Sequence, residues 1–207
     1  MNFNMKKLDS ITAVLLFALA LFSLMAFTTY NSNGSNVSEI PNIEIDGDTI
    51  TTKVIVKSQY ELFLDAVGHQ ESGNRYHIVN RYGYMGKYQF GKSTLRTLRI
   101  KVSRSEFLKD TLLQEEAMLK LLLHNKKRLQ KYIDKYEGKV VHGILVTESG
   151  LLAAAHLGGQ GSVKKWFRNG RIRKDGNGVQ LTSYMKRFGG YILNLSSNIY
   201  NKKCQIL

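Results

Sequence analysis

Residues 140–157 read VVHGILVTESGLLAAAHL, a run that is apolar on nearly every face of a helix apart from Glu148. A helix that is apolar all round is normally buried at the centre of a domain. We therefore expect residues 140–157 to form the central helix of a mainly α domain. The apolar fraction of 43% and the charged fraction of 22% are those of a globular protein, which excludes wholesale disorder.

The region before this segment contains a helix with clear boundaries. Ser58 and Glu61 match a capping box, and apolar residues follow at helical spacing, so a helix is expected to run toward Glu71. The sequence Ser72-Gly73-Asn74 ends this helix. Residues 75–91 are rich in Gly, Tyr and Asn, and they predict a loop with short strands.

Further helices are expected on both sides of the central segment. Residues 103–106 match a second capping box, which opens a long amphipathic segment that stops at Gly138. Residues 93–100 predict a short helix, and two more are expected around Trp166 and around Tyr184. The predicted fold class is therefore mainly α (α+β), with a small β element.

The N-terminus carries a targeting segment. Residues 11–27 contain no charge, and Lys6 and Lys7 precede them. The length of the segment is at the lower limit for spanning a bilayer and exceeds the usual apolar core of a cleaved signal peptide. It could therefore be either an uncleaved membrane anchor or a cleaved signal peptide. The poor cleavage pattern at Ala26-Phe27-Thr28 favours an uncleaved anchor. The lysines place the N-terminus in the cytoplasm and the domain outside it, in the cell envelope (the periplasm of a Gram-negative cell).

Three regions follow from these patterns. Residues 1–29 are the membrane anchor or signal segment, and residues 30–57 are a linker with possible short strands. The linker begins with Asn, Ser and Gly and then alternates in polarity over residues 43–56, as a short strand or a hairpin around Asp46-Gly47 would. Residues 58–207 are expected to form the main domain.

The positive charge is concentrated in the domain. The net charge is +14, but residues 58–207 hold 26 basic and 11 acidic residues, a net charge of +15. Such a field favours a polyanion, either nucleic acid, an anionic membrane surface or a cell wall. No recognised nucleic-acid-binding motif accompanies the basic runs at 126–128 and 168–174, so no nucleic acid is expected. The histidines lack the paired spacing of zinc ligands, so neither a metal nor a cofactor is expected.

Glu71 is the candidate acid. It ends an apolar helix and precedes a flexible loop, a position that can remove water from a carboxyl group and still leave it reachable. Burial disfavours the charged form of a carboxyl group, so such a group can stay protonated near neutral pH and donate a proton to a glycosidic oxygen. A helix-terminal Glu is otherwise a solvated charge.

Three motifs give this position a context. Glu71-Ser72 is followed by Gly86-Lys87-Tyr88-Gln89-Phe90 and later by Ala154-Ala155-His156-Leu157-Gly158, with Tyr184 after them. Their order and approximate separations resemble the lytic transglycosylase and goose-type lysozyme group of the lysozyme-like superfamily, over residues 58 to about 190. In the third motif Ala155 stands where that family has Tyr, and His156 stands where it has Asn.

The resemblance implies a lysozyme-like domain that acts on peptidoglycan glycan strands. Glu71 would protonate the oxygen between N-acetylmuramic acid and N-acetylglucosamine, and would then deprotonate the muramic acid 6-hydroxyl, which attacks its own anomeric carbon. The product would be a 1,6-anhydromuramyl end. The candidate substrate-binding residues are Ser72, Tyr84, Met85, Gly86, Tyr88, Gln89, Phe90, His156, Gly158 and Tyr184.

Other functions stay open at this point. A hydrolytic muramidase of the usual kind needs a second carboxylate, for which Glu148 is a candidate, although a buried and hydrogen-bonded Glu148 explains the sequence equally well. A non-catalytic peptidoglycan-binding module is a further alternative. Residues 86–93, GKYQFGKS, match the phosphate-binding P-loop pattern letter for letter. The residues before them make a poor core strand, so a nucleotide-binding protein is the remote alternative.

Overall fold

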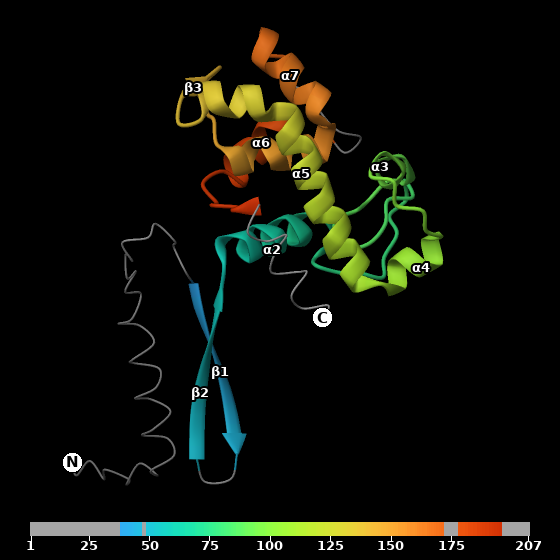
Figure 1. Cartoon of the computed structure of the whole chain (residues 1–207), viewed down its shortest axis with the longest axis vertical. Helices are drawn as coiled ribbons and strands as arrows, with labels where there is room; N and C mark the ends of the chain where they lie inside the picture. The colour runs from blue at the N-terminus through green and yellow to red at the C-terminus, as the bar shows by residue number, and fades with distance from the viewer. Residues whose placement is uncertain (1–37, 47–48, 172–177, 196–207) are drawn as a thin grey trace, which may run out of the picture. The chain divides into compact units, whose positions relative to one another are not determined.

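The computed structural model describes residues 38–46, 49–171 and 178–195, and for residues before Lys57 it describes the backbone alone. The targeting segment at residues 11–27 lies outside these ranges. The described part is mainly helical, with two small two-stranded antiparallel sheets (Figure 1). This confirms the predicted mainly α class with a minor β element. Within the described ranges no helix is both long enough and apolar enough to cross a membrane.

The first sheet is a hairpin in the region where the sequence predicts a strand or hairpin. Strands β1 (Ser38–Asp46) and β2 (Thr49–Lys57) pair in a continuous antiparallel register from Ser38 opposite Lys57 to Asp46 opposite Thr49. The β1 strand begins five residues before the alternation at residue 43. One residue separates β2 from the first described helix.

Helix α2 (Gln59–Ser72) has the boundaries that its sequence predicts. The Ser58 hydroxyl accepts a hydrogen bond from the Glu61 N–H, and the Glu61 carboxylate accepts one from the Ser58 N–H, which completes the capping box. Gly73 ends the helix with a left-handed φ of 65°, a conformation that glycine adopts without a steric penalty. Glu71 is therefore fixed in the last turn.

The predicted amphipathic segment that opens at the second capping box is not one helix. The box at residues 103–106 forms, but it opens the short helix α4 (Arg104–Lys109), and the long helix α5 (Thr111–Tyr136) starts separately. Asp110 lies between them with an extended backbone, and its carboxylate accepts a hydrogen bond from the Leu113 N–H at 2.8 Å. An Asp in this position caps a new helix, which is the physical reason for the break.

The prediction of one helix over residues 140–157 is wrong in its first part. Strands β3 (Val140–Val141) and β4 (Ile144–Leu145) form a hairpin, and helix α6 (Glu148–Gly158) follows. The turn residues His142 and Gly143 both have positive φ angles, 48° and 75°, as a two-residue turn that matches the twist of a hairpin requires. The Thr147 hydroxyl then caps α6 by accepting from the Gly150 N–H.

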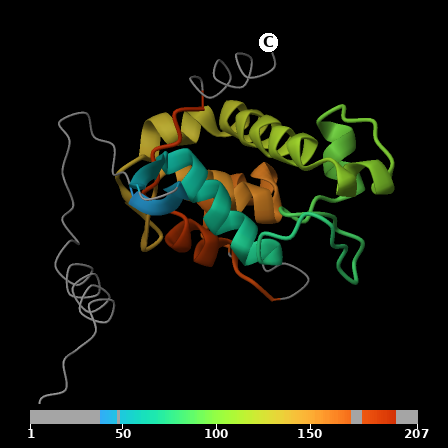
Figure 2. The same ribbon diagram turned by 90° about the horizontal axis from the view of Figure 1, so that it is seen from below.

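Helix α6 is the buried centre of the domain, as expected for its apolar part. It packs against α5, against α7 (Gln160–Asn169) and against α8 (Leu181–Arg187), and its residues 149–155 are all buried (Figures 1 and 2). A Cβ atom at Gly150 would come within 2.6 Å of the Met185 carbonyl oxygen, so this glycine allows α8 to approach closely. The helices predicted around Trp166 and Tyr184 are α7 and α8.

The chain between α2 and α4 is a loop followed by one short helix. The predicted loop forms, but instead of the predicted short strands it has only isolated bridges, which pair Met85 with Val79 and with Phe90. Helix α3 (Lys92–Thr97) ends three residues earlier than predicted.

Candidate active site

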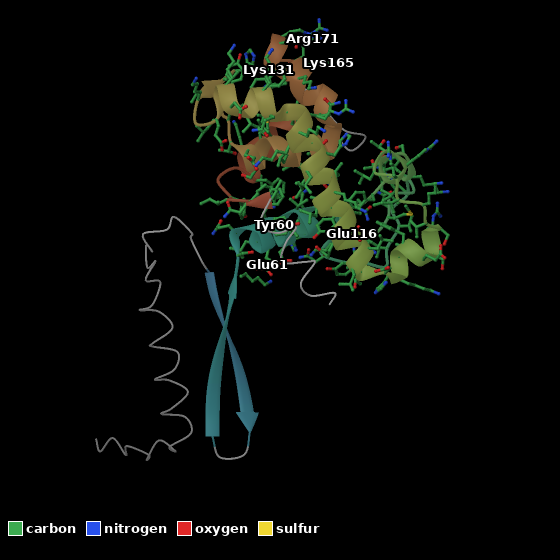
Figure 3. All side chains as sticks on the ribbon, in the orientation of Figure 1. Tyr60, Glu61, Glu116, Lys131, Lys165 and Arg171 are labelled. Carbon is green, nitrogen blue, oxygen red and sulfur yellow. The ribbon has the colours of Figure 1, made fainter. Side chains whose placement is uncertain are left out.

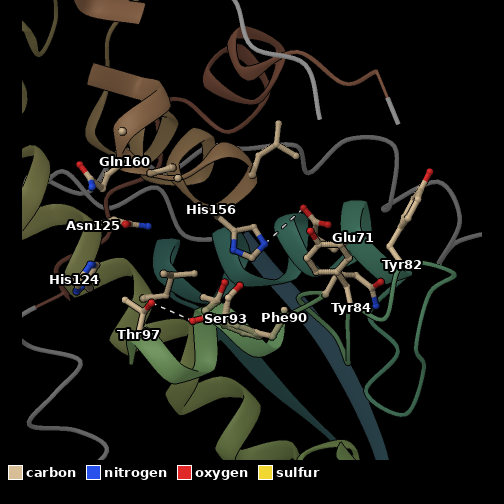
Figure 4. Close-up of a pocket in the computed structure, with 18 of the residues that line it drawn as sticks. Glu71, Tyr82, Tyr84, Phe90, Ser93, Thr97, His124, Asn125, His156 and Gln160 are labelled. Carbon is tan, nitrogen blue, oxygen red and sulfur yellow. Dashed lines mark hydrogen bonds and ion pairs between the residues drawn. The ribbon is translucent and has the colours of Figure 1, made fainter. Parts of the chain in front are cut away.

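A groove with a volume of about 590 Å³ is open to solvent beside Glu71 (Figure 4). Its walls come from the end of α2, the loop over residues 80–91, helix α3, the middle of α5 and the junction between α6 and α7. These segments are far apart in the sequence, and the contacts of α6 with α5 and α7 bring these three helices together. Such a concave and partly polar site is the usual form of a ligand-binding site.

Glu71 lies in the wall of this groove with 16% of its side chain exposed. Its Oε1 atom accepts a hydrogen bond from the Tyr184 hydroxyl at 2.7 Å. The Nε2 atom of His156 is 3.6 Å from the same oxygen. The structure thus brings the carboxylate, the phenol and the imidazole of three different helices into one cluster.

His156 takes the position that the resemblance assigns to Asn, and it faces Glu71 (Figure 4). It lies in the last turn of α6, where its side chain is 7% exposed and packs edge-on against the Phe90 ring. A ring nitrogen can donate a hydrogen bond to a carboxylate as an amide nitrogen does. His156 therefore places a potential hydrogen-bond donor beside Glu71, at a distance slightly longer than a hydrogen bond.

Three of the other predicted substrate-binding residues line the groove, namely Tyr84, Gln89 and Phe90. Gln89 has a positive φ of 50°, and its side-chain amide donates to the Gly86 carbonyl oxygen at 2.9 Å. The Tyr84 side chain lies in the wall and is well exposed, as is that of Tyr82. Exposed aromatic rings at the rim of a groove are suited to packing against sugar rings.

Six predicted substrate-binding residues do not line the groove: Ser72, Met85, Gly86, Tyr88, Gly158 and Tyr184. Ser72 has a supporting role, because its hydroxyl donates to the Lys87 carbonyl oxygen at 2.8 Å and accepts from the Arg75 N–H. This bond ties the end of α2 to the loop. Met85 and Tyr88 belong to the hydrophobic core.

A buried ionic cluster holds the loop from behind. The Lys87 ammonium group is 3.1 Å from a Glu115 oxygen and 3.3 Å from an Asp65 oxygen. The hydroxyls of Tyr76 and Tyr88 each donate to the Glu115 carboxylate at 2.7 Å. The cluster connects the loop to α2 through Asp65 and to α5 through Glu115.

The cluster changes the titration of its members. Burial favours the neutral form of Lys87, but the charge of Glu115 and the hydrogen bonds to Glu115 and Tyr76 together outweigh this effect and raise the pKa of Lys87 above its usual range. Burial and the charge of Glu115 both raise the pKa of the Tyr88 hydroxyl. Lys87 thus stays charged and Tyr88 stays neutral, which keeps their bonds to Glu115 intact near neutral pH.

Gln114 is a buried residue that the sequence does not single out. Its Oε1 atom accepts from the Lys87 N–H at 2.9 Å, and its Nε2 atom donates to the carbonyl oxygens of Tyr76 and Phe107. A Cβ atom at Gly86 would overlap this side chain, so the glycine is needed for the close approach. Gly86 therefore shapes the loop from behind instead of touching a ligand.

The P-loop resemblance has no matching local structure. The N–H groups of Gly86, Gln89 and Phe90 bond to backbone carbonyl oxygens, and that of Lys87 bonds to Gln114. A phosphate-binding loop needs these groups free to wrap the phosphates. The following helix, α3, has only six residues. These contacts disfavour the nucleotide-binding alternative.

The groove also contains polar residues that sequence reasoning missed. Ser93, Thr94 and Thr97 come from α3, and Asn125 comes from α5. Asn125 had a signal in the sequence, because it interrupts an apolar stripe at helical spacing whose buried members include Met118, Leu122 and Leu129. The α3 hydroxyls had none, since exposed Ser and Thr residues are common on short helices.

Glu148 is not a partner of Glu71. It lies in the first turn of α6 and forms an ion pair with Lys126 at 2.8 Å, with 18% of its side chain exposed. It lines a second hollow together with Glu137 and residues 191–195, and it does not line the groove. The sequence alternative of a buried, hydrogen-bonded Glu148 fits this position better than a catalytic role, although the side chain is half-buried and its partner Lys126 lies on α5.

Comparisons with protein-family models, with curated protein sequences and with solved structures find no match to this chain.

Proposed function

We propose that this chain is a peptidoglycan lytic transglycosylase with a lysozyme-like catalytic domain, in which Glu71 acts first as the acid and then as the base. The observation that carries the proposal is the isolation of Glu71. It is the single carboxylate among the described residues that line the groove. Hydrolysis of the usual kind needs two carboxylates at a defined separation, whereas an intramolecular transfer needs one.

The reaction follows from the position of this carboxyl group. Protonated Glu71 donates its proton to the glycosidic oxygen as the bond between that oxygen and C1 of the N-acetylmuramic acid breaks. The carboxylate then removes the proton of the C6 hydroxyl on the same sugar, and O6 forms a new bond to C1. Glu71 regains its proton, no water is consumed, and the product carries a 1,6-anhydro ring.

Tyr184 and His156 assist by holding the carboxyl group. Both reach the same oxygen, Oε1 of Glu71, which leaves Oε2 as the atom that exchanges the proton with the substrate. A hydrogen bond from Tyr184 also fixes the rotamer of Glu71, so that the acid keeps one orientation toward the groove.

The rim and the charge of the domain suit a cell-wall substrate. Tyr82 and Tyr84 offer exposed aromatic faces for sugar rings. The excess of basic residues favours a polymer that carries peptide carboxylates. In this proposal residues 1–29 attach the chain to the membrane or export it, with the catalytic domain on the outer side.

The test is the identity of the ends released from purified peptidoglycan by the full-length chain, measured by mass spectrometry. The proposal expects anhydromuramyl ends, which disappear with Glu71→Gln. Glu116→Gln is the matched control, because it removes an exposed carboxylate of α5 that pairs with Lys120 outside the groove, and it should leave the products unchanged. Reducing ends would instead establish a hydrolase, and the absence of fragments would favour a binding module.

A further inference from the structure

The groove extends beyond the catalytic cluster to a second polar region. Figure 4 shows His124, Asn125 and Gln160 toward one end of the site and Glu71, Tyr82 and Tyr84 toward the other, with His156 between. All of these residues line the same groove. The second region comes from the middle of α5 and the first residue of α7, two helices that contact each other.

Unpartnered polar atoms are concentrated in this groove. Among the described residues, five buried side-chain polar atoms have no hydrogen-bond partner, and three of these belong to groove residues: Asn125 Nδ2, His156 Nδ1 and Gln160 Oε1. The Asn125 residue is only 3% exposed. A buried polar group without a partner is costly, and native proteins rarely leave one unless a solvent molecule or a ligand completes it.

The two amides offer opposite hydrogen-bonding groups. Asn125 presents a donor, and Gln160 presents an acceptor. A secondary amide is complementary to this pair, since its carbonyl oxygen accepts and its N–H donates. A hydroxyl group donates and accepts through the same oxygen atom, so it must lie close to both side chains at once, whereas a secondary amide uses two separate atoms.

We propose that Asn125 and Gln160 form a subsite for the acetamido group of an N-acetylated β-1,4-linked sugar. Asn125 Nδ2 donates to the acetamido carbonyl oxygen, and Gln160 Oε1 accepts from the acetamido N–H. The inference rests on the proposed function, in which the groove takes the glycan strand. It adds a specificity determinant away from the scissile bond, where a sugar is recognised by its 2-substituent.

The second source of secondary amides in the cell wall is the stem peptide. The sugar is favoured because the groove that holds the two amides also exposes the rings of Tyr82 and Tyr84, and flat aromatic faces suit pyranose rings. The groove also continues to Glu71, so that one strand can occupy both regions.

The experiment measures binding to two neutral tetrasaccharides by titration calorimetry. Chitotetraose and cellotetraose share the β-1,4 backbone and differ in carrying an acetamido group or a hydroxyl at C2. The full-length Glu71→Gln protein is used, so that no cleavage interferes. We expect chitotetraose to bind at least about tenfold more tightly, as two hydrogen bonds to buried groups would give.

Two isosteric changes separate the donor from the acceptor. In the same background, Asn125→Asp replaces the donor with an acceptor and should reduce the preference for chitotetraose by about tenfold. Gln160→Glu keeps a hydrogen-bond acceptor at the same place and should preserve the preference for chitotetraose. Gln130→Glu is the matched control for added charge, because Gln130 is an exposed residue of α5 outside the groove.

Folding is checked by thermal melting followed by circular dichroism. If Asn125→Asp is unfolded, Asn125→Leu and Gln160→Met replace it, since each keeps the side-chain volume and removes the polar atom. A preference for chitotetraose that survives these substitutions, or a stem tetrapeptide that binds in a manner dependent on Asn125 while chitotetraose does not, would overturn the subsite.

The outcome is distinguishable from failure of the proposed function. If the native chain releases no fragments from peptidoglycan but the preference depends on Asn125, the subsite stands and the proposed reaction fails. If anhydromuramyl fragments appear and Asn125→Asp binds both tetrasaccharides as before, the reaction stands and the subsite fails.

Discussion

Glu71 depends on a tyrosine that is 113 residues further along the chain. The Tyr184 hydroxyl donates to Glu71, while its ring packs against Phe188 at 5.0 Å between centroids. The two parts of this side chain therefore have separable functions. The ring belongs to the hydrophobic core, and the hydroxyl orients Glu71.

Tyr184→Phe keeps the ring and removes the hydroxyl. We expect kcat for peptidoglycan cleavage to fall by about tenfold to a hundredfold, because a hydrogen bond to a charged group is worth about 1.5–3 kcal/mol. The KM and the thermal melting temperature should change little. An unchanged kcat would show that the Tyr184 hydroxyl is dispensable for the reaction.

Glu148→Gln tests the second carboxylate. Glu148 is paired with Lys126 and lies outside the groove, so the cleavage rate should stay within about twofold of that of the native chain. The comparison is the rate of fragment release under identical conditions. A loss as large as that expected for Glu71→Gln would support hydrolysis by a carboxylate pair.

The sequence identifies candidate site residues only where a residue type or motif is distinctive. Glu71 and Tyr184 are named by motif order, and the structure brings them into contact. Gln160 belongs to no motif and lies between glycines, so the sequence predicts only a turn at this position. Its role depends on α7 lying against α5, a contact between distant segments that no local pattern specifies.

Among the elements, the loop over residues 75–91 relies most on buried polar contacts. Gln114 of α5 forms two hydrogen bonds with the loop, at the Lys87 N–H and the Tyr76 carbonyl oxygen, and a third with the Phe107 carbonyl oxygen of α4. Replacing Gln114 with an apolar residue would leave the Lys87 N–H and two carbonyl oxygens without these partners. The loop supplies Tyr84 and Gln89 to the groove, so its stability and the integrity of the site are connected.

Gln114→Leu is expected to lower the free energy of unfolding by about 3 kcal/mol, since each buried unsatisfied group costs about 1–3 kcal/mol. Chemical denaturation measures this loss. Gln130→Leu is the control, because Gln130 is exposed on the same helix and should cost less than about 0.5 kcal/mol. Equal effects of the two substitutions would show that the Gln114 contacts add nothing beyond helix propensity.

The ionic cluster behind the loop predicts a dependence of stability on pH. Burial tends to raise the pKa of Asp65, but the hydrogen bond from Lys57 and the charge of Lys87 outweigh it and hold the pKa below its ordinary value of 3.8. A carboxyl group with a lowered pKa stabilises the fold above its ordinary value and loses this contribution as the pH falls through the folded-state value.

The unfolding free energy should therefore decrease as the pH is lowered below about 3.8, and Asp65→Asn should make this decrease shallower. Denaturant titrations at a series of acidic pH values measure the slope. The raised pKa of Lys87 acts in the opposite sense, because its contribution is complete below 10.5 and is lost at higher pH. Identical acid slopes for the two proteins would rule out a contribution from Asp65.

Element boundaries were predictable where a side chain marks them. Both capping boxes form as predicted, and Gly73 ends α2. The hairpin of β3 and β4 was not predictable from polarity, because its residues are as apolar as those of a buried helix. Only the pair His142-Gly143 marks it, and residues other than glycine are uncommon at a positive φ.

At the scale of the whole molecule, one end of the helical domain carries several exposed basic residues. Figure 3 shows Lys131, Lys165 and Arg171 toward one end of the helical domain, and Glu61 and Glu116 toward the other. Lys131 lies in the second half of α5 and Lys165 lies in α7, and Arg171 follows the end of α7 by two residues. A polymer with carboxylates can therefore meet this end by electrostatic attraction.

Cleavage of polymeric peptidoglycan should slow by about tenfold between 50 and 500 mM salt, because counterions screen attraction between exposed charges. Binding of neutral chitotetraose to the Glu71→Gln protein should change less than twofold over the same range. Replacing Lys131, Lys165 and Arg171 together with Gln should weaken the salt dependence. If all rates are insensitive to salt, charge does not recruit the substrate.

The hydrogen bond between Glu71 and Tyr184 also sets an order of events during synthesis. A ribosome makes the acid long before it makes the helix that orients it, so an emerging or truncated chain carries Glu71 without its partner. The cell wall is a covalent network on which survival depends, and an enzyme that cuts it is a hazard while it is being made and exported. If the proposed function holds, a chain that lacks α8 carries Glu71 without the hydroxyl that orients it, and should cut the cell wall more slowly than the full chain.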